Sequence, residues 1–178
     1  GTSGSVVRCV GGGVQTPARL RCRTGGGNLG TLAGLRGVRN GEVDRVASRV
    51  GMAYRLEQRV GTYSRGMRQR IGIAQAMLGR PRLLILDEPA NGLDPAGIRE
   101  IRELLRRLAG EGMAVFVSSH LLAEVELMCD RVGIIHKGRL LRSGTVQEMI
   151  SSARTMEFRV GDVARAMPVR EQGGRQAT

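Results

Sequence analysis

The sequence predicts an α/β fold, and three features of its second half carry this prediction. Two short apolar runs, Leu83 to Leu86 and Met113 to Val117, have the length and composition of strands buried on both faces of a parallel sheet. A segment with apolar residues at helical spacing separates the two runs, and another follows the second run. Strands that alternate with amphipathic helices are typical of the α/β class.

The part of the chain before the first run has little strand character. Residues 1–30 are rich in Gly and Arg and show no sustained periodicity, so we expect them to form loop. A helix is predicted from Glu42 to Gly51, and another begins near Ser64. The strand pattern starts only after Pro81.

The helix between the two apolar runs has clear boundaries. Asp94 is placed to cap its N-terminus, Pro95 takes the first helical position, and Gly110 ends it. Its apolar face consists of Ile98, Ile101, Leu104, Leu105 and Leu108. After the second run, we expect a helix from Leu121 to Met128 and two strands, VGIIH and RLLRSG. Beyond Arg154 the pattern thins into a solvated tail.

The composition is that of one globular domain, with 178 residues, 41% hydrophobic and 25% charged. No apolar stretch approaches the roughly 20 residues of a membrane-spanning helix, and the first residues lack the apolar core of a signal peptide. The three cysteines, Cys9, Cys22 and Cys129, have no C-x-x-C spacing, which argues against a zinc site and against a disulfide framework. The reducing cytoplasm is the simplest setting.

The net charge of +12 admits two kinds of anionic partner, a nucleic acid or a membrane surface. The basic residues are almost all Arg and are scattered among Gly and Leu, so a compositional preference for Arg over Lys explains much of the charge. Aromatic residues make up only 2% of the chain, which leaves few rings for stacking on bases. We therefore expect no specific nucleic-acid partner.

An acidic pair, Asp87 and Glu88, stands where the first buried strand ends. Parallel sheets place their ligands at this edge. One carboxylate there can hold Mg²⁺ through water, and its neighbour can orient the water that attacks a γ-phosphate. By itself, an acidic pair after an apolar run more often just opens a loop, so the interpretation depends on the other residues around it.

Two further groups extend this candidate site. His120 follows Ser118 and Ser119 at the end of the second apolar run, so parallel strands bring it to the edge that holds Glu88. A histidine there can donate a hydrogen bond to a phosphate oxygen, although a single loop His more often has no role. Ser64 and Gly66 precede or begin a helix, where a hydroxyl and free backbone N–H groups bind anions, although Ser is also the commonest plain N-cap.

These segments together resemble the nucleotide-binding subunit of an ATP-binding cassette (ABC) transporter of the drug or antibiotic exporter type. YSRGM matches a common variant of the family signature, and LLILDEP matches Walker B. NGLD, from Asn91 to Asp94, matches the D-loop, and SSH matches the switch histidine. The segment from Met128 to Thr145 is similar to the family's closing segment. The resemblance covers about residues 11–150 and implies a P-loop NTPase fold with a helical subdomain.

Upstream of the signature the resemblance is weaker. Gln15 falls at the position of the family's Q-loop. A phosphate-binding loop of the form G-x-x-x-x-G-K-[ST] does not occur, and the only lysine, Lys137, has no such glycines before it. The chain is thus expected to be an N-terminally truncated cassette that lacks the Walker A portion and is inactive alone. The expected divisions are 1–10 unassigned, 11–80 Q-loop remnant and helical subdomain, 81–153 the α/β core, and 154–178 an extension and tail.

The resemblance implies a role for each candidate residue. ATP and Mg²⁺ lie between two cassettes in the family, which makes a second nucleotide-binding domain and a membrane-spanning permease subunit the expected partners. Glu88 would be the general base and His120 a second catalytic residue, while Asp87 and Gln15 would hold Mg²⁺ indirectly. Cofactor-binding roles would fall to Gln15, Ser64, Gly66, Asp87 and Asp94. The expected location is cytoplasmic, at the inner face of the cell membrane.

Three functions remain open from the sequence. The first is an ABC transporter ATP-binding protein, an incomplete copy, whose ATP hydrolysis drives export of a small molecule. The second is a degenerate subunit that does not hydrolyse ATP and lends its signature to a partner. The third is an ABC-type ATPase that acts on nucleic acid. If the strand that leads into the phosphate loop is missing, we expect one edge of Leu83 to Leu86 to be unpaired.

Overall fold

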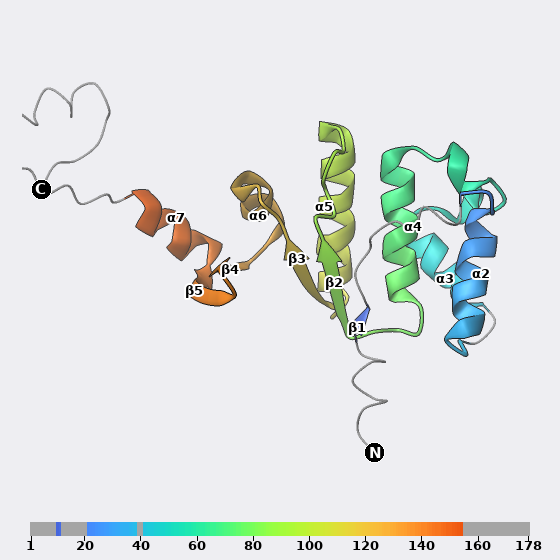
Figure 1. The fold of residues 1–178 in the computed structure, drawn as a ribbon, viewed down its shortest axis with the longest axis horizontal. Coiled ribbons are helices and arrows are strands. Elements are labelled where there is room, and N and C mark those ends of the chain that lie inside the picture. The colour runs from blue at the N-terminus through green and yellow to red at the C-terminus, as the bar shows by residue number, and fades with distance from the viewer. Residues whose placement is uncertain (1–9, 12–20, 39–40, 155–178) are drawn as a thin grey trace, which may run out of the picture. The chain divides into compact units, whose positions relative to one another are not determined.

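A computed structural model describes residues 10–11, 21–38 and 41–154, and Figure 1 shows its elements. The described residues form two compact units, divided between Met128 and Cys129. The first contains β1 (Val10–Gly11), α2 (Gly25–Leu35), α3 (Glu42–Arg49), the 3₁₀ turns η2 (Ala53–Arg55) and η3 (Val60–Thr62), α4 (Arg65–Met77), β2 (Leu83–Asp87), α5 (Pro95–Gly110), β3 (Ala114–Ser118) and α6 (Leu122–Met128). The second contains β4 (Arg131–His136), β5 (Arg139–Thr145) and α7 (Val146–Arg154).

A parallel sheet in the order β1-β2-β3 forms the centre of the first unit. In β2, Leu84 and Leu86 are fully buried. They belong to the same core cluster as the apolar face of α5, where Ile101, Leu104 and Leu108 are buried. In Figure 1, α4 lies beside the strands and α5, while α2 and α3 lie on the far side of α4. The predicted α/β fold is confirmed, and it places the carboxyl ends of β2 and β3 at one edge.

The N-terminal region differs from the predicted loop, because α2 begins at Gly25. Thr24 caps this helix, and its Oγ1 accepts a hydrogen bond of 3.0 Å from the N–H of Gly27. Leu29 and Ala33 on the same helix are buried in the core. Glycines disfavour a helix by about 1 kcal/mol each, but a capped first turn and a buried apolar face offset this cost here.

The pairing of β2 also differs from the expectation of an unpaired edge. β1 pairs with β2 at Leu83 and Leu84, and β3 pairs along all of β2. β3 is an edge strand of this sheet, and no described strand pairs along its outer side. It is not the fully buried strand that its sequence predicted, because Phe116 is 57% exposed and Ala114 on the same face is exposed as well.

The second unit is an antiparallel pair followed by a helix. β4 and β5 pair from Arg131 and Thr145 to His136 and Arg139, with a shift in register between Ile134 and Ile135. Thr145 and Glu148 cap the start of α7 reciprocally, since each accepts a hydrogen bond from the other's backbone N–H. None of the helices in the described part of the chain is long and apolar enough to cross a membrane.

Candidate functional site

The edge at which β2 and β3 end is fixed by one hydroxyl group. Asp87 and Ser118 are the last residues of their strands and face each other in the parallel register. The Ser118 hydroxyl donates a hydrogen bond to Asp87 Oδ1 and accepts one of 3.1 Å from the backbone N–H of Glu88. That N–H also donates to the Ser118 carbonyl at 3.2 Å. Ser118 thus positions both members of the acidic pair.

Glu88 leaves the strand in an unusual backbone conformation. Its φ of 47° lies in the left-handed region, which is uncommon for residues other than glycine. Such conformations cost roughly 1–3 kcal/mol and tend to occur at functional sites. In this conformation Glu88 Oε1 lies 2.8 Å from Nδ1 of His120. The turn therefore brings a carboxylate and an imidazole from two neighbouring strands together.

The second carboxylate oxygen of Glu88 is buried and finds no hydrogen-bond partner in the part of the chain that the structure describes. The Glu88 side chain as a whole is 28% exposed and that of His120 is 62% exposed. Buried polar atoms in native proteins nearly always have a partner, so an orphaned one calls for an explanation. A bound water or ligand that supplies a hydrogen bond to Oε2 would meet this need.

Glu88 also changes the titration of His120. The hydrogen bond that the ring donates to Glu88, and then the negative charge of Glu88, raise the pKa of the His120 imidazole above its usual range, and the charge of Glu124 contributes in the same direction. In its cationic form the ring donates from both nitrogens. The pair can therefore offer a hydrogen-bond donor and a carboxylate acceptor at the same edge.

The loop that carries His120 is held by a second serine. Ser119 Oγ accepts a hydrogen bond of 3.1 Å from the N–H of Leu121 and donates one of 3.1 Å to Glu124 Oε2 on α6. Glu124 is buried. No role for Ser118 or Ser119 was predicted from the sequence. The two serines position the site residues beside them, and their place at the end of an apolar run, directly before His120, could have indicated this.

A tight turn leads from Glu88 to α5. The N–H of Asn91 donates to the Glu88 carbonyl at 3.1 Å, and Gly92 has a φ of 68°. Asp94 then caps α5, its Oδ1 accepting a hydrogen bond of 3.0 Å from the N–H of Gly97. The predicted N-cap is confirmed. The carboxylate of Asp94 is thus engaged within its own helix, and its role towards a nucleotide stays a prediction.

Ser64 and Gly66 lie at the start of α4. Ser64 is the predicted N-cap, and its Oγ accepts a hydrogen bond of 3.2 Å from the N–H of Met67. The hydroxyl is nonetheless on an exposed residue, and a methyl group placed on Gly66 would meet no atom within 4 Å. The backbone at this helix start is therefore accessible from outside.

Arg65 connects this helix start to the turn after Glu88. Its Nη1 donates a hydrogen bond of 2.9 Å to the carbonyl of Gly92. The guanidinium group takes the space that a side chain at Gly92 would need. This contact of Arg65 was not predicted, since nothing in the order of residues indicates that the two segments touch.

The structure thus gathers part of the predicted site. Asp87, Glu88 and His120 lie together at the β2–β3 edge, and Asp94 follows them at the start of α5. Ser64 and Gly66 lie apart from them, at the start of α4, and Gln15 falls outside the described residues. No group of three or more His, Cys, Asp or Glu residues within the described ranges is arranged to hold a metal ion. Mg²⁺ is commonly held by one or two carboxylates together with substrate phosphates, and Asp87 fits that arrangement.

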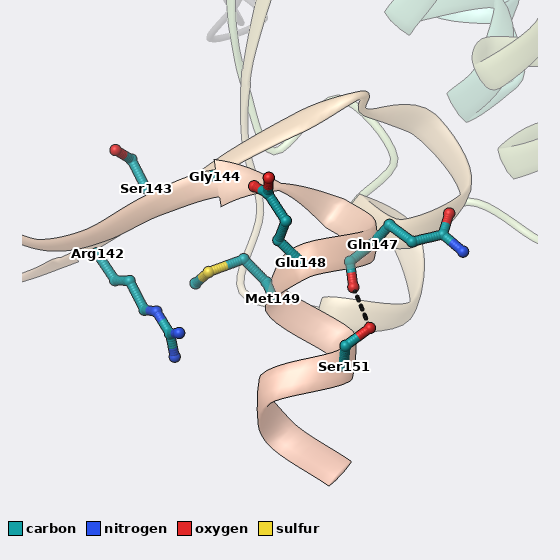
Figure 2. Close-up of a pocket in the computed structure, with 7 residues that line it drawn as sticks. All are labelled: Arg142, Ser143, Gly144, Gln147, Glu148, Met149 and Ser151. Carbon is teal, nitrogen blue, oxygen red and sulfur yellow. Dashed lines mark hydrogen bonds between the residues drawn. The ribbon is translucent and has the colours of Figure 1, made fainter. Parts of the chain in front are cut away.

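A hollow in the second unit contains none of the predicted site residues. It has a volume of about 560 Å³ and lies between the end of β5 and the first turns of α7 (Figure 2). Ser151 closes one side by donating a hydrogen bond of 2.8 Å to the Gln147 carbonyl. The Glu148 carboxylate, which also lines it, caps the helix. The polar groups named here, those of Glu148 and Ser151, thus form hydrogen bonds with the backbone at or near the start of α7.

Comparison with known proteins shows which proteins this chain is similar to. A profile of the family described as ABC transporter matches residues 12–91. The ABC transporter ATP-binding protein YhcH of Bacillus subtilis is 47% identical over 169 residues, covering 93% of this chain and 55% of that protein. The bacitracin transport ATP-binding protein BcrA of Bacillus licheniformis is 41% identical over 170 residues, covering 94% of this chain and 56% of that protein. The chain therefore spans about half the length of these curated relatives.

A solved structure shows the same fold. CbiO1 of Clostridium perfringens, described as part of the ABC transporter complex CbiONQ, superposes with a TM-score of 0.74 at 28% identity, covering 84% of this chain and 62% of that one. The fold is that of a P-loop NTPase of the ABC ATPase type. The chain belongs to the ABC transporter ATP-binding family, whose members generally bind ATP with Mg²⁺.

Proposed function

We propose that this chain forms part of an ATPase that drives export of a small molecule through a membrane partner. The observation that carries the proposal is the Glu88–His120 pair, 2.8 Å apart, with the unpartnered Oε2 of Glu88 beside it. A relative, BcrA, is described as a bacitracin transport protein, which favours an antibiotic or a similar small molecule as the cargo. The expected partners are a membrane-spanning permease and a second ATP-binding domain, at the inner face of the membrane.

The chemistry assigned to this chain follows from the two oxygens of Glu88. Oε1 is held by His120, and Oε2 is free to accept a proton from an attacking water. Bound Mg²⁺ and ATP would supply the electrophilic γ-phosphorus. Asp87, steadied by Ser118, would bind the ion through water, and cationic His120 would donate a hydrogen bond to a phosphate oxygen. Gln15 is proposed as a further indirect ligand of Mg²⁺.

The start of α4 is proposed to act on a nucleotide held by the second ATP-binding domain. The exposed Ser64 hydroxyl and the open space at Gly66 support this role, because a phosphate could approach the backbone there. Arg65 ties this helix start to the turn that follows Glu88. The two parts of the site thus serve different nucleotides, one on each side of a dimer.

A substitution at Glu88 tests the hydrolytic role. In the assembled transporter, Glu88→Gln is expected to lower ATP turnover by about 10²–10⁴-fold, because it removes a general base while keeping the shape of the side chain. ATP binding, measured by equilibrium dialysis, should persist. Glu126→Gln, an exposed carboxylate on α6, is the matched control and should leave turnover unchanged. Turnover that survives in Glu88→Gln would refute the assignment.

A second experiment distinguishes ATP hydrolysis at this chain from a role in which its signature segment acts on a nucleotide bound by a partner. The 178-residue chain is mixed with a complete ABC ATP-binding subunit, and the turnover of that subunit is measured. Ser64→Arg should remove any stimulation by placing bulk where a phosphate must sit, whereas Glu88→Gln should matter less. Equal loss in both variants would contradict the division of the site between two nucleotides.

A further inference from the structure

A cavity at the opposite edge of the sheet has four arginines among its eight lining residues. It has a volume of about 390 Å³, within the range of small-ligand sites. Three segments distant in sequence form its wall: α3, the connection from α4 to β2, and the connection from α5 to β3. Both connections lie at the ends of the strands away from Glu88, at the lower end of the sheet in Figure 1. The lining residues are Arg45, Arg49, Arg80, Pro81, Arg82, Glu111, Gly112 and Met113.

The charges around this cavity do not balance. Four guanidinium groups line it, and two carboxylates face them. Glu42 is buried at the side, where it pairs with Arg45 at 2.7 Å and with Arg80 at 2.9 Å. Glu111 pairs with Arg49. In the described part of the chain no side chain forms an ion pair or hydrogen bond with the guanidinium of Arg82. The wall therefore keeps an excess of positive charge.

The pKa of Arg49 also reflects the positive charges around it. Burial lowers the pKa of its guanidinium, and the charges of Arg45 and Arg107 lower it further. Arg107 reaches the same place because it donates a hydrogen bond to the Arg49 carbonyl. A negative ligand would relieve this repulsion.

Three of the four guanidinium groups are held by carboxylates, those of Arg45 and Arg80 by Glu42 and that of Arg49 by Glu111. Arg45 donates to the Met77 carbonyl at 3.2 Å as well as to Glu42, which fixes its planar group against α4. Arg80 and Arg82 flank Pro81, whose ring restricts the chain between them. Pre-organised guanidinium groups bind phosphate oxygens through paired N–H donors.

We propose that this cavity binds a phosphate-bearing anion through Arg49 and Arg82, at a site separate from the β2–β3 edge. The ligand class is a free phosphorylated molecule or a lipid headgroup, since both present the same oxygens. This site lies at the amino ends of β2 and β3, whereas Asp87, Glu88 and His120 lie at their carboxyl ends. Its occupation therefore does not depend on the hydrolytic role proposed above.

Calorimetric titration of the chain with inorganic pyrophosphate tests the proposal. Saturable binding is expected. The double variant Arg49→Gln/Arg82→Gln should weaken the affinity for pyrophosphate at least about tenfold, because it removes the charged hydrogen-bond donors that face the ligand. Arg99→Gln/Arg102→Gln on α5 changes the net charge equally and should keep the affinity. Glu111→Gln removes a lining carboxylate and should strengthen binding. Equal weakening in both double variants, or none in the first, would overturn the site.

Two further measurements complete the test. Sedimentation with phosphatidylglycerol vesicles, against phosphatidylcholine vesicles, shows whether a lipid headgroup is the source of the phosphate; loss of this binding in Arg49→Gln/Arg82→Gln would also support the site. If that variant does not fold, the unaltered chain is treated with an arginine-specific reagent. Pyrophosphate should then protect Arg49 and Arg82 from modification, and unprotected arginines there would refute the proposal.

Discussion

At the scale of single residues, the pairing of Glu88 with His120 makes a prediction about pH. His120 titrates above its ordinary value because Glu88 holds its cationic form. A raised pKa in the folded state stabilises the fold below the unfolded value of about 6.5, and this contribution is lost as the pH rises through the folded value. NMR titration of the His120 ring should show the raised pKa, and Glu88→Gln should lower it. A His120 pKa that is unchanged by Glu88→Gln would contradict the contact between the two side chains.

At the scale of elements, Glu42 joins α3 to the segment before β2. Its carboxylate is 9% exposed and accepts hydrogen bonds from Arg45 and Arg80. Glu42→Gln is expected to lower the free energy of unfolding by about 1–3 kcal/mol, because two arginines lose the charge that they face. Urea denaturation checks this, with Glu103→Gln on the exposed face of α5 as the control.

The same contact has a definite pH dependence. The hydrogen bond from Arg45, followed by that from Arg80, lowers the pKa of Glu42 despite the opposing effect of burial. A lowered pKa stabilises the fold above the unfolded value of about 4.3, and the contribution is lost as the pH falls through the folded value. The difference between the unaltered chain and Glu42→Gln should therefore shrink in acid. A difference that stays constant to low pH would argue against the ion pairs.

At the scale of the whole molecule, the open side of β3 predicts association between copies of the chain. Phe116 is 57% exposed on this strand, and open strands with apolar side chains pair readily with other chains. Phe116→Thr is expected to raise the fraction of monomer at a given concentration, measured by size exclusion with light scattering. Tyr54→Ser, an exposed aromatic on η2, is the matched control. Equal effects of the two substitutions would mean that general hydrophobicity, rather than β3, drives association.

The sequence predicted the parts of this molecule that depend on local pattern. The apolar run before Asp87, the cap at Asp94 and the meeting of Glu88 with His120 all follow from periodicity and from the shared edge of parallel strands. Contacts between segments distant in sequence were not predicted. Three features depend on tertiary packing, which short windows of sequence do not encode. They are the pairing of β1 with Leu83, the Ser118 hydroxyl between the Asp87 carboxylate and the Glu88 backbone N–H, and the cluster at Arg49.

The contact between Arg65 and Gly92 has a consequence for how this protein can change over generations. The guanidinium fills the volume beside Gly92, so any side chain introduced there would collide with it, and the left-handed backbone adds a second obstacle. A shorter residue in place of Arg65 removes the collision with the guanidinium but leaves the left-handed backbone at position 92. In relatives, the two positions should therefore vary together, with a residue other than glycine at the second only where the first is small.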